Sequence, residues 1–130
     1  MMEILEGFPG NVVAVRASGK LAREDYEKVL IPAVETALIG RDKIRVYYEL
    51  DTDSVSMEPA AAWEDLKLGM SHYMQWEGIA VVTDYEWIRH AIDVLCFLIH
   101  GQVRTYPKSR VSEARDWIIS ELTRKTIRLT

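Results

Sequence analysis

A single six-residue run constrains the fold more strongly than any other part of the chain. Residues 78–83 read Gly-Ile-Ala-Val-Val-Thr, and the four residues in the middle are all apolar. A strand with one face in water alternates between apolar and polar residues, whereas a run that is apolar on both faces is typical of a central strand in a parallel sheet. The length of 130 residues suits one domain built around such a sheet and leaves little room for two separate cores.

Strand and helix patterns alternate along the rest of the chain. β-branched or alternating residues predict strands at 2–5, 12–17, 43–50 and 102–106. Apolar residues spaced three and four apart predict helices at 23–38, 59–74, 85–99 and 112–122. The order β-β-α-β-α-β-α-β-α predicts an α/β fold with a mostly parallel central sheet, an N-terminal antiparallel hairpin and flanking helices.

Three local features refine this prediction. Gly19 is expected to end the second strand, and residues 51–57 are expected to form a polar loop. Pro32 lies inside the first helix and is expected to bend it or to remove one backbone hydrogen bond. In the strand at 43–50, alternation places Ile44, Val46, Tyr48 and Leu50 on one face and Lys43, Arg45, Tyr47 and Glu49 on the other.

Charge and cysteine content exclude several classes of protein. The chain carries 16 basic and 20 acidic side chains, and this net charge of −4 argues against a nucleic-acid binder. A single cysteine excludes an intramolecular disulfide framework and fits a reducing compartment. The N-terminus does not resemble a signal peptide, and the most apolar segment, residues 94–99, is far shorter than the roughly 20 residues of a membrane helix. We therefore expect a cytoplasmic protein.

The order of these elements resembles the STAS domain and, more closely, the SpoIIAA-like family of small bacterial proteins. The motifs that carry the resemblance span nearly the whole chain: residues 15–21 followed by Asp25-Tyr26, residues 48–51, residues 78–84 with Trp87 behind them, and residues 114–117. We expect a single SpoIIAA-like domain over residues 1–123 and a short basic tail over residues 124–130. The resemblance implies a relation to CRAL-TRIO-type lipid carriers, a lipophilic ligand beneath mobile helices, and membrane association.

One departure from the STAS pattern concerns phosphorylation. The resemblance implies, for anti-sigma-factor antagonists, a phosphorylatable serine at the start of the helix after the third strand, in an Asp-Ser-Ser/Thr-Gly type motif. Ser54 and Ser56 lie near that position, but the glycine and the paired hydroxyls are missing. Nearby acidic residues oppose a phosphate by like-charge repulsion. Ser54 and Ser56 are candidate modification sites, but we expect no typical phospho-serine switch in this chain.

The residues that usually carry catalysis form no recognisable constellation. The three histidines, His72, His90 and His100, lack the spacing of metal ligands. Cys96 lies in an apolar run, which indicates a buried small side chain rather than a nucleophile. Asp51 and Asp53 follow a strand at a position where α/β sheets often bind ligands, although turn formation explains them better. We expect no enzyme, no metal and no cofactor.

The second and third predicted helices are unusually rich in aromatic and large apolar residues. The third is apolar over more than one face at its end, so part of its surface meets something besides the sheet. Our first hypothesis is a non-enzymatic domain with an apolar cavity for a lipophilic small molecule, lined by Trp63, Leu66, Met70, Tyr73, Trp87, Ile88, Ala91 and Leu95. The alternative is that the same surface forms a homodimer or binds a regulatory partner protein. Peripheral membrane contact is a further expectation, to which the basic tail adds a weak hint.

Overall fold

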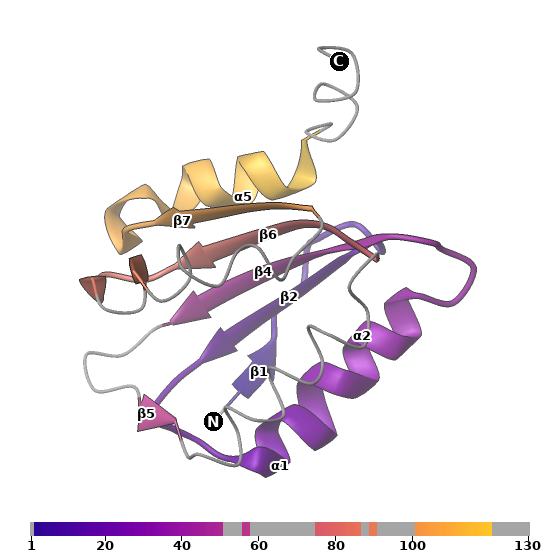
Figure 1. Cartoon of the computed structure of the whole chain (residues 1–130), viewed down its shortest axis with the longest axis horizontal. Coiled ribbons are helices and arrows are strands. Elements are labelled where there is room, and N and C mark those ends of the chain that lie inside the picture. Colours follow the sequence, from indigo (N-terminus) through magenta and orange to yellow (C-terminus); the bar gives the residue numbers. More distant parts are fainter. Residues whose placement is uncertain (1, 51–55, 58–74, 87–88, 91–100, 121–130) are drawn as a thin grey trace.

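The computed structural model describes residues 2–50, 56–57, 75–86, 89–90 and 101–120. Five strands form one sheet in the order β1-β2-β4-β6-β7 (Figure 1). They are β1 Met2–Ile4, β2 Val12–Ala17, β4 Ile44–Leu50, β6 Trp76–Val82 and β7 Gln102–Tyr106. β1 runs antiparallel to β2, and every other neighbouring pair in this sheet is parallel. The predicted hairpin and the mostly parallel sheet are therefore confirmed.

The central strand lies where the sequence predicted it. β6 pairs with β4 on one side and with β7 on the other, and it begins at Trp76 rather than at Gly78. Ala80 and Val82 are completely buried on one face of the sheet, and Val81, which alternation places on the other face, is also buried. Burial on both faces explains why residues 79–82 are all apolar instead of alternating with polar residues.

The predicted loop at 51–57 is partly wrong. Ser56–Met57 form a short strand, β5, which pairs in parallel with β3, Lys20–Leu21. Gly19 separates β2 from β3 with a φ of +63°, a left-handed conformation that glycine adopts without strain. Strands of two residues are too short to show alternation, so the sequence pattern does not reveal this second sheet.

The first predicted helix is continuous over residues 23–37 but consists of three parts. These are α1 Arg23–Asp25, the π-helix η1 Tyr26–Leu30 and α2 Ile31–Ala37. The backbone N–H of Ile31 donates to the carbonyl of Tyr26, five residues earlier. Pro32 follows directly, has no N–H, and its ring crowds the carbonyl four residues before it. The wider π turn accommodates the proline, so the helix continues with the predicted loss of a backbone hydrogen bond.

The later helices are described only in part. α5 Val111–Ile119 follows a short 3-10 helix, η3 Lys108–Arg110, and begins one residue before the predicted position. The predicted helix at 59–74 lies outside the described residues. Of the predicted helix at 85–99, four residues are described: Glu86, Arg89 and His90 are helical, whereas Tyr85 is not, so the helix begins one residue later than predicted.

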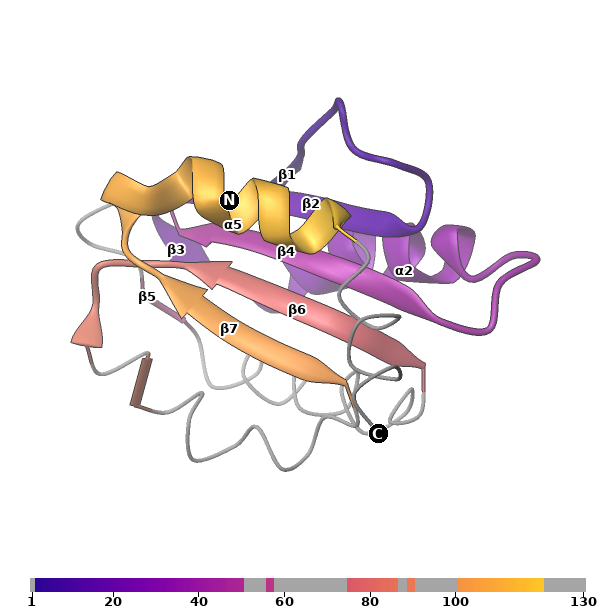
Figure 2. The ribbon, with the colours of Figure 1, turned by 90° about the horizontal axis from the view of Figure 1, so that it is seen from above.

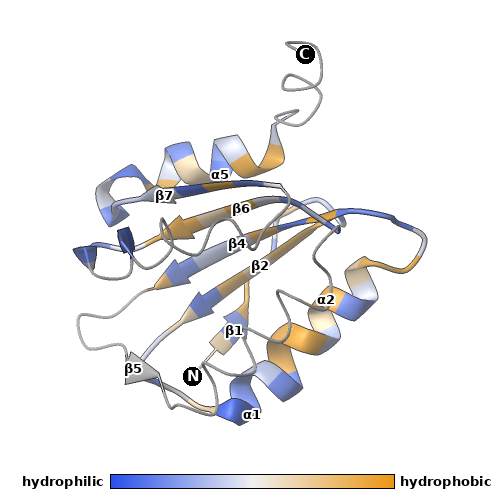
Figure 3. Cartoon of the chain, viewed as in Figure 1, coloured by the Kyte–Doolittle hydropathy of each residue, from blue (hydrophilic) through white to orange (hydrophobic). Residues whose placement is uncertain are grey.

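Different helices cover the two faces of the five-stranded sheet. The segment from α1 to α2 lies against one face, and α5 lies against the opposite face (Figures 1 and 2). We call these the α2 face and the α5 face. Tyr26, Leu30 and Val34 belong to the apolar core of the α2 face, whereas Ala114 and Ile118 belong to that of the α5 face. Figure 3 shows that α1 is mainly hydrophilic, whereas α2 carries hydrophobic residues.

The predicted alternation of β4 is confirmed by the residues that belong to the two apolar cores. Ile44, Val46 and Leu50 are buried in the core of the α2 face, and Tyr48 packs against that core. Tyr47 is completely buried in the core of the α5 face. β4 therefore has both faces covered, and its charged residues on the α5 face are drawn into the interior. That arrangement leads directly to the first candidate site.

Candidate functional site

The predicted ligand cavity is not described by the structure. All eight residues named for it lie outside the described residues, namely Trp63, Leu66, Met70, Tyr73, Trp87, Ile88, Ala91 and Leu95. The same holds for Ser54, Asp51, Asp53, Cys96, His72 and His100. Ser56 belongs to β5, where its backbone pairs with Lys20. His90 is exposed. The cavity remains a prediction, and the described residues offer two other candidates.

The first candidate is a buried carboxylate on the α5 face. Glu49 is only 6% exposed and lies near the carboxyl end of β4. Arg16, directly opposite it on β2, donates from Nε to Glu49 Oε2 at 2.7 Å. The Tyr47 hydroxyl donates to Glu49 Oε1 at 2.5 Å. Each carboxylate oxygen therefore has a strong donor, as a buried charge requires.

The fourth member of this cluster comes from α5. Arg115 Nη2 lies 3.6 Å from Glu49 Oε1, and Arg115 Nε lies 3.5 Å from the Tyr47 hydroxyl oxygen. The guanidinium carbon also lies 5.7 Å from the ring centres of both Phe8 and Tyr47, within cation–π range. We call these four residues, Glu49, Tyr47, Arg16 and Arg115, the Glu49 cluster; they connect β2 and β4 to α5.

The protonation states in the Glu49 cluster follow from these contacts. Burial by itself would raise the pKa of Glu49, but hydrogen bonds from Tyr47 and Arg16 outweigh it, so the pKa of this carboxyl is lowered. Burial, together with the hydrogen bond to Glu49, raises the pKa of Tyr47 to about 12. Near neutral pH the cluster therefore holds a charged carboxylate and a neutral phenol. Both are held by neighbouring side chains, which suits a structural anchor better than proton transfer.

A second polar anchor fixes the end of α5. Arg45, on the same face of β4, donates from Nη1 to the carbonyl of Ile118 at 2.8 Å and also to the carbonyl of Ser120. Its Nε forms an ion pair with Glu77. The last carbonyls of a helix have no partner within the helix, and a cation there also complements the helix dipole. Arg45 therefore caps α5 from the sheet.

The sequence pattern missed both anchors, although one signal was present. Arg45, Tyr47 and Glu49 alternate along the second face of a strand whose neighbours are β2 and β6. Polar residues at alternate positions usually indicate a solvated face. Only the position of α5, which follows about sixty residues later in the sequence, shows that this face is covered.

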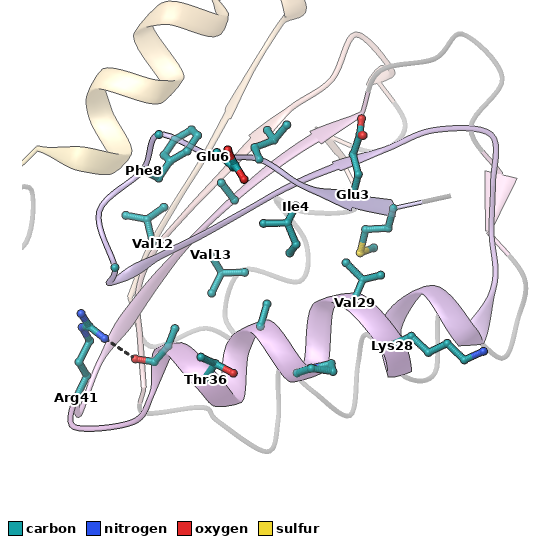
Figure 4. A pocket seen from close by; sticks show the side chains of 18 residues that line it. Glu3, Ile4, Glu6, Phe8, Val12, Val13, Lys28, Val29, Thr36 and Arg41 are labelled. Atoms are coloured by element: carbon teal, nitrogen blue, oxygen red, sulfur yellow. Dashed lines mark hydrogen bonds between the residues drawn. The ribbon is translucent and has the colours of Figure 1, made fainter.

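The second candidate is an open groove between α2 and the N-terminal hairpin (Figure 4). Its volume is about 760 Å³. One wall is the hairpin around β1 and the start of β2, and the other is the helix from Lys28 to Ala37 with Arg41 beyond it. The apolar lining residues are Met2, Ile4, Leu5, Phe8, Val12, Val13, Ala14, Val29, Pro32, Ala33 and Ala37.

Charged side chains mark the borders of the groove. In Figure 4, Lys28 and Arg41 lie at opposite ends of the helical wall, and Glu3 and Glu6 lie on the hairpin wall. Arg41 Nη1 donates to the carbonyl of Ala37 at 3.1 Å. A Cβ at Gly10 would lie 2.7 Å from Arg41 Nη2, so the glycine permits this close approach. The groove thus offers an apolar floor with a cation at each end.

No group of three or more His, Cys, Asp or Glu side chains in the described part of the chain is placed to hold a metal ion. No helix formed by the described residues has both the length and the apolar character needed to cross a membrane.

Comparisons with known proteins identify the family. The sequence model of the SpoIIAA-like family matches residues 12–119. Among solved structures, the chain is similar to an uncharacterized protein of the DUF3478 family with a SpoIIAA-like fold from Shewanella loihica PV-4. The two share 29% sequence identity with a TM-score of 0.65, over 91% of this chain and 92% of the other. No match was found among curated proteins. The fold and the family resemblance predicted from the sequence are both confirmed, and the chain belongs to the SpoIIAA-like family.

Proposed function

We propose that this chain is a non-enzymatic binding domain that holds a lipophilic small molecule. The observation that carries the proposal is the groove between α2 and the N-terminal hairpin. Its volume of about 760 Å³ falls within the range of small-molecule sites, roughly 300–1,000 Å³. Such sites are usually lined by apolar side chains with a few polar groups that orient the ligand, which matches the apolar floor and charged borders of this groove.

The cationic side chains at the two ends of the groove favour a ligand that carries a negative charge. A lipophilic molecule with one anionic end would place its apolar part along Val13, Val29 and Ala33. Its charged end would meet Lys28 or Arg41. Lys28 is 74% exposed and is 3.6 Å from Glu24, so its ammonium reaches water and can also turn toward a ligand.

The non-enzymatic part of the proposal rests on the Glu49 cluster. Glu49 is the buried carboxylate of the described residues, and both of its oxygens already accept hydrogen bonds. A general base must reach the proton of its substrate, and a carboxylate that is 6% exposed and held by Arg16 and Tyr47 is not placed to do so. We also propose a cytoplasmic location, because a chain with one cysteine fits a reducing compartment.

Blocking the groove tests the proposal. Ala33→Trp places a large ring in the groove, whereas Glu35→Trp places the same ring on an exposed position of α2 that does not line it. The probe is a fluorescent long-chain fatty acid analogue, titrated into each purified protein after organic extraction of any bound molecule. We expect the wild type and Glu35→Trp to bind the probe and Ala33→Trp to bind at least tenfold more weakly. Equal binding by the two variants would exclude the groove.

A second pair of substitutions separates the groove from the cavity predicted between residues 59 and 99. Trp87→Ala combined with Leu95→Ala changes two residues named for the predicted cavity and none of the described residues that line the groove. If the groove is the site, this double variant binds the probe like the wild type, provided that circular dichroism shows an intact fold. If binding is lost in the double variant and kept in Ala33→Trp, the ligand occupies the predicted cavity instead.

A further inference from the structure

β1 lies at the edge of the five-stranded sheet and turns some of its backbone groups away from β2. It is the terminal strand of the five-stranded sheet and pairs with β2 alone among the described strands. The N–H of Leu5 donates to the carbonyl of Ala14, so alternation turns the backbone groups of Glu3 and Leu5 toward β2. The N–H and carbonyl of Ile4 then point away from β2, as do those of Met2, a residue that is 5% exposed and belongs to the core of the α2 face. Such an edge is a template for another strand.

The side chains beside this edge are apolar. Ile4 is 50% exposed, pairs with Val15 and shares its face of the sheet, the α2 face. It lines the groove together with Val29, Pro32 and Ala33 of the helical segment. Figure 4 shows Ile4 and Val29 on opposite walls of the groove, both labelled. An added strand would therefore find both backbone partners and an apolar surface.

We infer that the occupant of this edge is β1 of a second copy of the chain, related by a two-fold axis. In an antiparallel pair, the two Ile4 residues come opposite each other at the axis, and Met2 of one copy lies opposite Glu6 of the other. This register uses the outward backbone groups of both strands. A register that centres on Glu3 instead would place two carboxylates directly opposite each other, which is destabilising.

Charge complementarity supports the same arrangement. In Figure 4, Lys28 lies at the Glu3 end of the groove, whereas Glu6 lies farther along the hairpin wall. The two-fold axis reverses the second hairpin, so it brings the partner's Glu6 to the end where Lys28 lies. Each copy thus offers an acidic hairpin wall and a basic helix end, a self-complementary surface of the kind that two-fold dimers require.

The proposed dimer interface includes more than the two β1 strands. A specific interface buries about 800 Å² on each partner, more than a three-residue strand can provide. With the two β1 strands paired, the two α2 helices lie on the same side of the joined sheet. Their groove-facing residues, Pro32, Ala33 and Thr36, would complete the interface. The dimer therefore encloses the groove, but it does not depend on a bound ligand.

The oligomeric state of the extracted, ligand-free protein tests the inference. We expect light scattering after size-exclusion chromatography to give a dimer for the wild type and a monomer for Ile4→Lys. The control is Ile39→Lys, which changes an isoleucine that is 75% exposed and does not line the groove. It should remain dimeric. A monomeric wild type, or a dimeric Ile4→Lys protein, overturns the inference.

Disulfide formation tests the register. In a Cys96→Ser background, Ile4→Cys should form an intermolecular disulfide under mild oxidation, because directly opposed residues of this kind have their Cα atoms about 5.5 Å apart, within the range of a disulfide. Glu3→Cys should form it at least tenfold more slowly. Equal rates would reject the pairing of Ile4 with Ile4. A monomeric protein that still binds the fatty acid probe would reject the dimer and leave the proposed function standing.

Discussion

The two faces of the sheet are held together by different kinds of interaction. α5 is tied to β4 by directional contacts of Arg45 and by the Glu49 cluster. The segment from α1 to α2 packs through apolar side chains such as Leu30 and Val34, and it leaves an open groove beside β1. Directional polar contacts fix one arrangement, whereas apolar contacts tolerate small displacements. The α5 face is therefore suited to hold the fold, and the α2 face is suited to admit a ligand or a partner.

The largest effect is expected from removing the carboxylate at the centre of the Glu49 cluster. Glu49→Ala removes the carboxylate that accepts from Arg16 Nε and the Tyr47 hydroxyl and that pairs with Arg115, while Arg16 keeps Glu3 at 3.7 Å. Breaking a buried ion pair costs about 3–5 kcal/mol, and the lower end applies because both arginines reach water. Urea unfolding followed by circular dichroism measures the change. Glu35→Ala, an exposed glutamate on α2, is the control and should lie within about 0.5 kcal/mol of the wild type.

The dependence of the free energy of unfolding on acidic pH tests the role of the same carboxylate. Because the pKa of Glu49 is lowered in the folded protein, its contribution is present above its ordinary value of 4.5 and is lost as the pH falls through the lowered pKa. Glu49→Gln should flatten this part of the curve. An unchanged acid limb would mean that Glu49 does not stabilise the fold through its charge.

A smaller effect is expected at the end of α5. Arg45→Met removes the donor for the carbonyls of Ile118 and Ser120 and leaves Glu77 without its ion-pair partner. We expect a loss of about 1–3 kcal/mol, the cost of leaving buried polar groups unsatisfied. Hydrogen exchange should speed up in α5 before it does in α2. The control is Arg23→Met, which breaks an exposed ion pair with Glu27 and should change stability by less than about 0.5 kcal/mol.

The smallest effect is expected at Tyr47 and is best seen at high pH. Tyr47→Phe removes one of the donors to Glu49 and should cost about 1 kcal/mol at neutral pH. Since burial raises the pKa of Tyr47 from 10.0 to about 12, the wild type loses stability as the pH rises between these values. The phenylalanine variant should lack this loss. An identical alkaline limb in both proteins would show that Tyr47 ionises as easily in the folded state.

The sequence predicted the framework because its signals are local. Periodicity places the strands and helices, and the apolar run at residues 79–82 identifies the central strand. The Glu49 cluster was not predicted, because it joins Arg16, Glu49 and Arg115 from positions far apart in the chain. The groove was missed for the same reason, since it depends on how the hairpin lies against α2. The cavity predicted around Trp63 and Trp87 lies outside the described residues.

The π turn before Pro32 sets the angular phase of the helix that forms one wall of the groove. Tyr26, Leu30 and Val34 are spaced four residues apart, and an α-helix turns about 40° past a full circle over that spacing. In an unbroken α-helix, each of these residues would be rotated by about 40° relative to the one before it, so Val34 would turn away from the sheet. The wider turn at η1 takes back part of that rotation and keeps all three against the sheet. A single-residue insertion between residues 26 and 30 would therefore act at a distance, by turning Ala33 and Thr36 out of the groove.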